Sequence, residues 1–216
     1  MRTEARRERL ESEVVTDTTG SSTPSPSGAS SGTSVPSRPP AIRLLVVVAL
    51  AIVGLGWDLW TKQEVFAQIG YPGVTPVWKG QIAGVSIRFE LATTFNHGAL
   101  WGMGQGQTWL FASLSFVAIA AIAYFLWNRQ AIASRWLTVV TGLLLAGTLG
   151  NLFDRLGLHR YQDDKGAIVY AVRDFLDFWF FNDSFHWATF NCADIYLVVG
   201  ACMLVIHSFW VPADAT

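Results

Sequence analysis

Long apolar blocks alternate with polar segments along the chain, and four of these blocks are long enough to cross a lipid bilayer. They cover residues 41–60, 109–127, 136–153 and 190–210. A membrane-spanning helix needs about 20 consecutive, mostly apolar residues. Tryptophan lies at one or both ends of each block, which is typical of the boundary between lipid and water. The pattern therefore predicts four transmembrane helices.

The segments between these blocks follow other patterns. Residues 85–91 alternate apolar and polar side chains, the period of a half-buried β-strand, and glycine and proline recur in residues 70–84. We expect a small extracytoplasmic sheet within residues 61–107, which are not helical in pattern. Residues 169–181 are strongly aromatic, and we expect them to form a loop or helix along the membrane interface. The predicted fold class is thus membrane all-α, with these two additions.

The composition excludes an ordinary soluble domain. Hydrophobic residues make up 51% of the chain and only 14% of the residues are charged. Residues 1–40 differ, because they mix charges with a Ser-, Pro- and Gly-rich tract that cannot bury a core, so we expect a disordered cytoplasmic tail there. The membrane domain is predicted to cover residues 41–211, followed by a short tail at 212–216. The formal net charge of -1 gives no reason to expect nucleic acid as a partner.

The positions of arginine predict which side of the membrane each segment faces. Arg38 and Arg43 flank the start of the first block, and Arg129 and Arg135 occupy the short connection between the second and third. Segments rich in Lys and Arg stay in the cytoplasm. Both termini of this multi-pass chain are therefore predicted to be cytoplasmic.

With this topology, polar residues that are far apart in the sequence gather at the outer ends of the blocks. They are Asp58 and Lys62 after the first block, Asn151, Asp154 and Arg155 after the third, Asp174 in the last outer segment, and Asn191 and Asp194 at the start of the fourth. Carboxylates in or near a bilayer are costly and usually functional. The arrangement predicts a functional site at the outer membrane face.

Asp174 and Asp194 are the candidate catalytic pair. Asn191 and Asp194 are three residues apart and can face one cavity from a helix, whereas Asp174 reaches them only if its segment folds back. Two carboxylates that meet at low dielectric constant cannot both ionise, so one keeps a proton. Such a pair can serve as general base and general acid toward water and a peptide bond. The alternative is a hydrogen-bonded polar cluster without chemistry, and the residues alone favour neither.

Asp58 and Lys62 also have two interpretations. They are four residues apart and can form an ion pair within the site. Alternatively they anchor the end of the first helix, with the lysine reaching outward to water. Four further acids are expected to be solvated loop residues: Asp163, Asp164, Asp177 and Asp183.

Gly147, Asn151 and Asp154 share one face of the third predicted helix. An Asn and an Asp on such a face need partners inside the bundle, because lipid offers none. If Arg155 neutralises Asp154, this group is a polar scaffold, since a paired carboxylate is a poor proton carrier. The four histidines show no spacing typical of metal ligands, and we expect neither a metal nor another cofactor.

Five short motifs follow one another along the chain. They are Asp58-Leu-Trp-Thr-Lys62; Asn96-His-Gly98-Ala99-Leu-Trp-Gly102; Gly147-Thr-Leu-Gly150-Asn151-Leu-Phe-Asp154-Arg155; Val172-Arg-Asp174-Phe175; and Phe190-Asn191-Cys-Ala193-Asp194. In these motifs, and in their placement relative to the four blocks, residues 44–206 resemble the lipoprotein signal peptidases, the bacterial type II signal peptidases. Each motif is loose by itself, but five in this order are specific.

The resemblance implies four transmembrane helices with a small sheet cradle and an interfacial loop on the periplasmic side of the cytoplasmic (inner) membrane. It implies an intramembrane aspartyl endopeptidase without metal or cofactor. The substrate would be a prolipoprotein that carries diacylglycerol on a cysteine and is cut just before that cysteine by water that the aspartates activate. Membrane lipids would be the other partner, and a monomer the functional unit.

The resemblance also implies roles for individual residues. The catalytic residues would be Asp174 and Asp194. The supporting residues would be Asp58, Lys62, Asn96, Gly147, Asn151, Asp154, Arg155, Asn191 and Ala193.

Two other classes of function remain as alternatives. A proton-coupled transporter could use Asp58, Asp154 and Asp194 as relay groups, but transport needs a path through the membrane, and no acid lies in the middle or inner half of any block. A non-enzymatic membrane assembly factor is the other alternative. Packing alone, however, does not require polar motifs to gather at one depth.

Overall fold

The computed structural model describes residues 41–98, 104 and 106–210, which belong to one unit spanning Arg38–Thr216. The predicted tails at 1–40 and 212–216 lie outside the described residues. So does the segment from Ala99 to Gly102, which ends the second motif.

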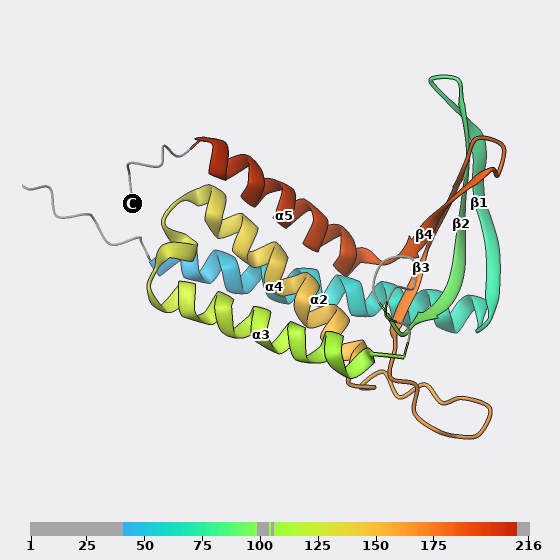
Figure 1. Cartoon of the computed structure of the whole chain (residues 1–216), viewed down its shortest axis with the longest axis horizontal. Coiled ribbons are helices and arrows are strands. Elements are labelled where there is room, and N and C mark those ends of the chain that lie inside the picture. The colour runs from blue at the N-terminus through green and yellow to red at the C-terminus, as the bar shows by residue number, and fades with distance from the viewer. Residues whose placement is uncertain (1–40, 99–103, 105, 211–216) are drawn as a thin grey trace, which may run out of the picture. The chain divides into compact units, whose positions relative to one another are not determined.

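In the described part of the chain, four α-helices lie side by side (Figure 1). They are α2 (Ala41–Ile69), α3 (Thr108–Trp127), α4 (Arg135–Arg155) and α5 (Cys192–Trp210), with a short 3-10 turn, η2 (Gln130–Ile132), between α3 and α4. All four are long and apolar enough to cross a membrane. The prediction of four such helices is confirmed.

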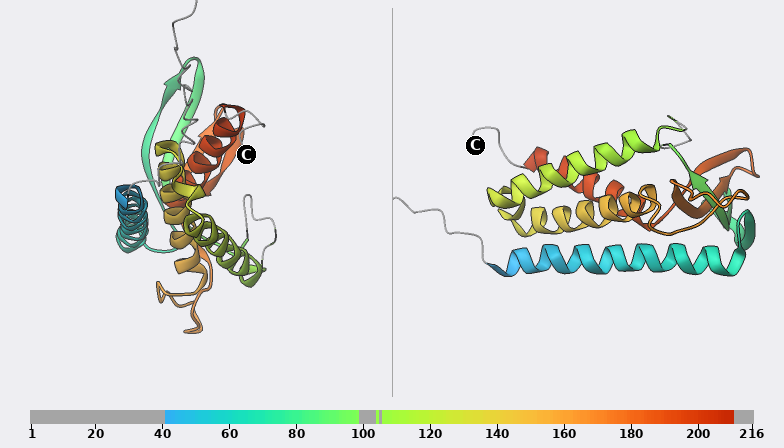
Figure 2. Two further views of the ribbon diagram at one scale, coloured as in Figure 1. Left: turned by 90° about the vertical axis from the view of Figure 1, so that its left-hand side faces the viewer. Right: turned by 90° about the horizontal axis from the view of Figure 1, so that it is seen from below.

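Helix α2 is longer than its apolar block. It continues to Ile69 and reaches the sheet beyond the ends of the neighbouring helices (Figure 2). Asp58, Lys62 and Phe66 succeed one another at helical spacing and are all buried, so the helix continues on a partly polar face. The expectation that residues 61–107 are not helical is therefore wrong for the first part of that range.

Helix α4 is the central helix of the bundle and contacts the other three. Over half (56%) of its most apolar window is buried, against at most 17% for the other helices. Close packing depends on its glycines: a Cβ on Gly147 would lie 2.5 Å from the carbonyl oxygen of Ala193 in α5. Small residues allow such close approach in membrane helices, where dispersion contacts hold helices together.

A four-stranded antiparallel sheet lies at one end of the helices (Figures 1 and 2). Its order is β1 (Gly73–Ile82), β2 (Val85–Asn96), β3 (Val172–Phe180) and β4 (Phe185–Phe190). The predicted strand at 85–91 lies within β2. The central contact joins β2 and β3, which come from two different segments of the chain.

The aromatic stretch 169–181 was expected to be an interfacial loop or helix, and this is wrong. Residues Val172–Phe180 form strand β3, paired with β2 on one side and β4 on the other. The first four residues of β3 are all buried. A strand buried on both faces loses the alternation by which a strand is recognised in a sequence. Strand β4 likewise ends at Phe190, so α5 begins two residues later than its apolar block.

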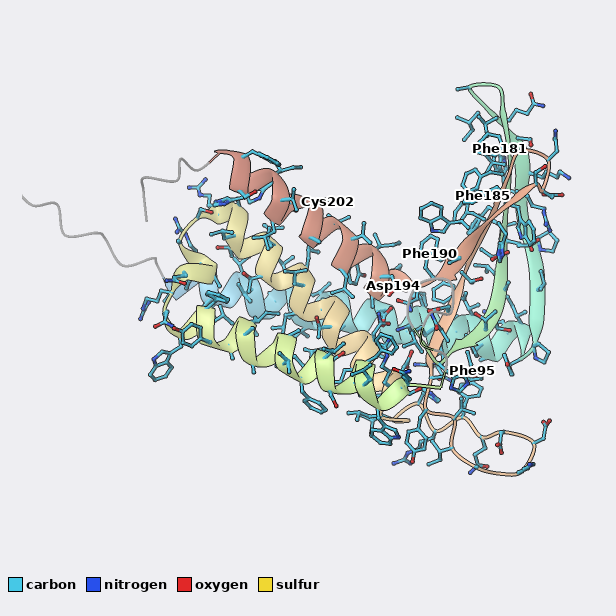
Figure 3. All side chains as sticks on the ribbon, in the orientation of Figure 1. Phe95, Phe181, Phe185, Phe190, Asp194 and Cys202 are labelled. Carbon is cyan, nitrogen blue, oxygen red and sulfur yellow. The ribbon has the colours of Figure 1, made fainter. Side chains whose placement is uncertain are left out.

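Aromatic rings join the sheet to the end of α2. Phe95 of β2 is labelled in Figure 3. Between ring centroids, it lies 5.3 Å from Phe66 in α2, 4.6 Å from Tyr71 and 5.8 Å from Tyr161. Such tilted and edge-on pairs add about 0.5–1.5 kcal/mol each beyond the area that they bury. The cluster holds β2, and hence Asn96, beside the helix ends.

Candidate active site

Asp174 lies in β3 at the base of the sheet and is 2% exposed. Both of its carboxylate oxygens accept hydrogen bonds from asparagine amides. Asn191 Nδ2 donates to Oδ1 at 2.6 Å, and Asn96 Nδ2 donates to Oδ2 at 3.0 Å. The register places Asn96 two residues along β2 from Thr94, the residue that pairs with Asp174. The strand pairing therefore delivers Asn96 to this carboxylate.

Asp194 lies in the first turn of α5, at the same end of the bundle (Figure 3). Its Oδ1 accepts from Asn151 Nδ2 at 2.7 Å and its Oδ2 from the backbone N–H of Asn191 at 3.1 Å. The Asp194 backbone N–H in turn donates to Oδ1 of Asn191 at 3.1 Å. This reciprocal pair is a capping box, in which two orphan N–H groups of a helix start are satisfied. It fixes the Asp194 side chain against the helix terminus.

Asparagine side chains connect the two aspartates. Asn191 Nδ2 donates both to Asp174 and, at 3.2 Å, to Oδ1 of Asn151, whose own amide donates to Asp194. The chain of contacts thus runs from Asp174 through Asn191 and Asn151 to Asp194. The structure brings together these four residues, all of which were predicted from the sequence. They come from β3, α4, the residue between β4 and α5, and α5 itself.

The electrostatic setting of Asp174 favours its protonated form. Burial raises the pKa of Asp174 to about 8, and the nearby charge of Asp194 acts in the same direction. The hydrogen bonds from Asn96 and Asn191 and the charge of Lys62 lower this pKa, but by less. Because neutral pH lies below that value, the pair of Asp174 and Asp194 retains one proton there.

A second polar group lies beside the aspartates and consists of ion pairs. Lys62 Nζ lies 2.7 Å from Asp58 Oδ2 and 3.1 Å from Asp154 Oδ2, and all three side chains are 0% exposed. Lys62 also donates to Oδ1 of Asn151 at 3.2 Å, which ties this group to the asparagine chain. The interpretation in which Lys62 reaches out to water is wrong.

Ala193 and the helix α4 glycines complete the packing around Asp58. The backbone N–H of Ala193 donates to Asp58 Oδ1 at 2.8 Å. A Cβ on Gly150 would collide with the Asp58 carboxylate, and one on Gly147 with the Ala193 carbonyl. Ala193 itself is fully buried. The predicted positions Gly147 and Ala193 therefore lie where α4 and α5 pack most closely.

Asp154 is not neutralised by Arg155. Within the described residues its ion-pair partners are Lys62 and Arg173, the latter at 2.9 Å from Nη2 to Oδ1. Arg155 instead donates from Nη2 to the carbonyl of Gly98 at 3.3 Å, and its guanidinium lies 5.5 Å from the centre of the Phe111 ring. Consecutive helical residues point about 100° apart, so the two side chains diverge.

Arg155 borders a groove of about 250 Å³ on the side of the bundle. The groove is lined by residues of α3, α4 and α5: Phe111, Leu114, Ser115, Ala118, Thr148, Asn151, Arg155 and Leu197. Its polar residues are Ser115, Thr148, Asn151 and Arg155. Asn151 also donates to Asp194, so the groove adjoins the aspartates.

A larger cavity, of about 600 Å³, lies between the end of α2, the start of α3 and the loop that precedes β3. Phe66, Phe95, His97, Trp109 and Tyr161 are among its lining residues, whereas neither Asp174 nor Asp194 is. The aspartates therefore do not line this larger cavity. Burial lowers the pKa of His159 and raises that of Tyr161 in the same loop.

Asp177 was expected to be a solvated loop acid, and this is wrong. It lies in β3, is 3% exposed, and accepts from His186 Nε2 at 2.6 Å, Thr189 Oγ1 at 2.8 Å and Trp179 Nε1 at 2.8 Å. The other three acids of that prediction, Asp163, Asp164 and Asp183, are exposed. Asp177 differs from them because a central strand carries it between two neighbours.

Arg173 is the residue of this region that sequence reasoning missed. It is 1% exposed and binds Asp154. The signal available was a lone cation in a stretch of apolar and acidic residues, directly before Asp174. In the described part of the chain, no three His, Cys, Asp or Glu side chains are grouped so that they could hold a metal ion.

Comparisons with known proteins agree with this architecture. Two solved bacterial membrane enzymes, determined by the in meso method at 2.3 and 1.9 Å resolution, match with TM-scores of 0.59 and 0.54. Their sequence identities are 22% and 24%, and the matches cover 82% and 77% of this chain and 92% of each of theirs. At these identities the two structures show the fold alone.

Sequence comparison gives the family. A lipoprotein signal peptidase of Rhodopirellula baltica is 39% identical, covering 79% of this chain and 74% of that protein. Another of Aeromonas hydrophila is 35% identical, covering 74% of this chain and 86% of that protein. The family model described as signal peptidase (SPase) II matches residues 50–210. With four helices that can span a membrane and a match over most of its length, this chain belongs to the family of lipoprotein signal peptidases, signal peptidase II.

Proposed function

We propose that this protein is an intramembrane aspartyl endopeptidase that removes the signal peptide from diacylglyceryl-modified prolipoproteins, cutting just before the lipidated cysteine. Membership of the signal peptidase II family supports the substrate class. The observation that carries the aspartyl mechanism is the connection of buried Asp174 to Asp194 through Asn191 and Asn151. In this setting the pKa of Asp174 is raised to about 8.

One proton shared by the two aspartates is sufficient for peptide hydrolysis. The ionised carboxylate removes a proton from water, whose oxygen attacks the carbonyl carbon of the scissile bond. The protonated carboxyl group donates to the carbonyl oxygen. When the tetrahedral intermediate collapses, the C–N bond breaks and a proton passes from the pair to the leaving nitrogen. The pair titrates as a unit, so base and acid are roles of the pair and not of either residue.

The asparagines hold the carboxylates without neutralising them. The side chains of Asn96 and Asn191 donate to Asp174, and that of Asn151 donates to Asp194. An amide carries no charge. A carboxylate that is bound by amides stays in place and remains able to exchange a proton. A carboxylate that contacts Lys or Arg differs, because the neighbouring positive charge favours the ionised form of the carboxylate.

The groove beside Arg155 is proposed to receive the apolar part of the lipopeptide near the scissile bond. Its α3 and α5 residues are mostly apolar, and its Asn151 also binds Asp194. A lipid-bearing substrate needs its acyl chains to remain in the bilayer while the peptide bond reaches the aspartates. A groove on the side of a helix bundle, open toward lipid and adjoining the pair, satisfies both requirements.

We propose that the aspartates and the sheet lie near the periplasmic face of the inner membrane, with both termini cytoplasmic. Arg43 and Arg135 lie at the opposite end of their helices from Asp58 and Asp154, and the positive-inside rule assigns the arginine-rich end to the cytoplasm. We further propose that a monomer is active, because one chain supplies every residue of the site.

The test is cleavage of a purified diacylglyceryl-modified prolipoprotein by the purified protein in detergent or lipid, followed as a mass shift. The parent is expected to cut this substrate and to leave the unmodified precursor intact, with or without a chelator. Asp174→Asn and Asp194→Asn are expected to be inactive, whereas Asp183→Asn, a matched change in an exposed acid, is expected to cut normally. Undiminished cleavage by either of the first two variants would refute the aspartyl pair.

A further inference from the structure

Arg173 is one of the least exposed cations in the described chain, and it directly precedes Asp174. Its side chain is 2% exposed. A buried cation is costly unless charged partners satisfy it, so its position requires an explanation. Successive side chains of a strand point to opposite faces, so Arg173 and Asp174 leave β3 in opposite directions.

Two parts of Arg173 hold the same carboxylate. Its backbone N–H donates to Asp154 Oδ2 at 3.0 Å, while Nε and Nη2 donate to Oδ1 at 3.1 and 2.9 Å. Its remaining terminal nitrogen, Nη1, donates to Gln63 Oε1 in α2 at 3.3 Å. One residue of β3 is thereby fastened to both α4 and α2.

Arg173 also balances the charge of the buried ion pairs. With Asp58, Lys62 and Asp154 it forms a continuous group of two anions and two cations, in which Lys62 bridges the two carboxylates. The formal sum is zero. Without Arg173, one negative charge would be left uncompensated in a site where every member is buried.

We propose that Arg173 is a positioning residue for the aspartyl pair. Asp174 has its own hydrogen bonds to Asn96 and Asn191 on one side of β3. The neighbouring Arg173, on the other side, fixes the same stretch of backbone to α4. Helix α4 carries Asn151, which binds Asp194. The link from Asp154 to Arg173 therefore sets the distance between the strand that bears one aspartate and the helix that orients the other.

The planar fork of arginine is suited to this task. Two of its nitrogens reach one carboxylate oxygen and a third reaches Gln63, an arrangement that the single nitrogen of lysine cannot reproduce. Arg173→Lys would keep the charge but lose the fork. Arg173→Met would lose both. The two substitutions therefore separate charge from geometry.

This inference rests on the proposed peptidase activity, and the test measures kcat and KM for cleavage of the lipid-modified precursor. Arg173→Met is expected to lower kcat by about 100-fold with KM within about twofold, because a misplacement of about 1 Å at a catalytic group has an effect of this size. Arg173→Lys is expected to recover part of the loss, to about 10-fold. A residue needed only for folding would change the amount of folded enzyme and leave kcat per folded molecule unchanged.

Arg88→Met is the matched control. Arg88 lies in β2, pairs with Glu90 and Asp183, and lies over the ring of Trp179, five residues along β3 from Asp174. Its loss is expected to leave kcat within about twofold of the parent. If Arg173→Met folds poorly, the double variant Arg173→Met/Asp154→Leu removes both members of the pair and leaves the neutral Asp58–Lys62 pair. It is expected to restore thermal stability but not kcat.

Parental kcat in Arg173→Met or in the double variant would overturn the positioning role. The parent and Asp174→Asn run in the same assay. If the parent itself fails to cut, the proposed function has failed. If the parent cuts and the Arg173 variants cut equally well, only the positioning role has failed.

Discussion

Two polar groups lie side by side at the end of the helix bundle, and they differ in what surrounds their carboxylates. In the first, Asp58 and Asp154 contact the cations Lys62 and Arg173 directly. In the second, Asp174 and Asp194 are bound by neutral asparagine amides and a backbone N–H. Both groups are largely buried, so burial alone does not distinguish a structural carboxylate from a reactive one.

The two groups differ in how their carboxylates are stabilised and in whether proton binding by the carboxylates is part of the proposed chemistry. In the first group each carboxylate contacts a cation, so the loss of either partner would leave an unpaired buried charge. A carboxylate that only amides bind can take up a proton at a moderate free-energy cost, and burial raises the pKa of Asp174 to about 8. Changes in the first group should therefore act on stability and on the placement of β3, whereas changes in the second should act directly on the chemistry.

The largest expected effect is a loss of activity when a residue of the second group is substituted. Asp194→Asn should lower kcat by more than about 1,000-fold, since the pair would lose an acid–base partner. Its melting temperature should fall only slightly, because the asparagine oxygen can still accept from Asn151 and only the bond from the Asn191 backbone N–H is lost. Parallel cleavage and thermal unfolding measurements check both parts. A variant that loses its fold along with its activity would contradict the comparison.

Substitution in the first group should have the opposite result, a large loss of stability with a smaller loss of activity. Lys62→Met removes the cation between two buried carboxylates and should destabilise the protein by about 3–5 kcal/mol, with kcat per folded molecule reduced less than in Asp194→Asn. Lys79→Met, at a side chain that is 67% exposed, is the control and should change stability by less than about 0.5 kcal/mol. Equal stability of the two variants would show that the ion pairs contribute nothing.

Measurements of stability and cleavage at a series of pH values test whether the folded protein binds a proton at Asp174. The pKa of Asp174 is raised from 3.8 to about 8, so between these values the folded state binds a proton that the unfolded state has lost. The free energy of unfolding should therefore fall as pH rises from about 4 to about 8, by at most about 1.4 kcal/mol per pH unit. Cleavage should also decline above about pH 8, when the pair loses its proton.

Asp174→Asn provides the control for that series. The variant cannot titrate at this position, so its melting temperature should vary less between pH 4 and 8 than that of the parent. A parent and variant with the same slope would mean that Asp174 is not the group that binds the proton.

The helices and most of the site could be predicted from the sequence because their signals are local. Apolar length defines each span, and Asn191 and Asp194 lie on one helix turn whatever the rest of the chain does. The pairing of β3 with β2 is different, because it depends on contacts between segments some 80 residues apart, such as Thr94 with Asp174. Residues 172–175 are all buried, so no alternation marked them as a strand.

The wrong pairing of Asp154 has the same origin. Arg155 is adjacent in sequence and was therefore the obvious cation, whereas Arg173 reaches Asp154 only after β3 has docked beside α4. One of the two interpretations of Lys62 likewise let it reach water, because nothing in its own helix shows that α4 brings a second carboxylate to it. Ion pairs between elements follow the tertiary arrangement, and local spacing does not reveal them.

The smallest expected effect is a shift in the pKa of Asp174, and it tests what the asparagines of the second group contribute. Asn96 donates to Asp174 Oδ2 at 3.0 Å, and this hydrogen bond lowers the pKa of Asp174. Asn96→Ala should therefore raise that pKa and move the alkaline limb of the rate profile upward by less than about one pH unit, with about a 10-fold lower kcat. Asn128→Ala is the control and should change neither the alkaline limb nor kcat. Asn128 lies just beyond the end of α3, and its side-chain amide donates to the Tyr124 carbonyl. A downward shift in Asn96→Ala would mean that the amide stabilises the protonated form, and the asparagines would then hold the proton on the pair instead of easing its release.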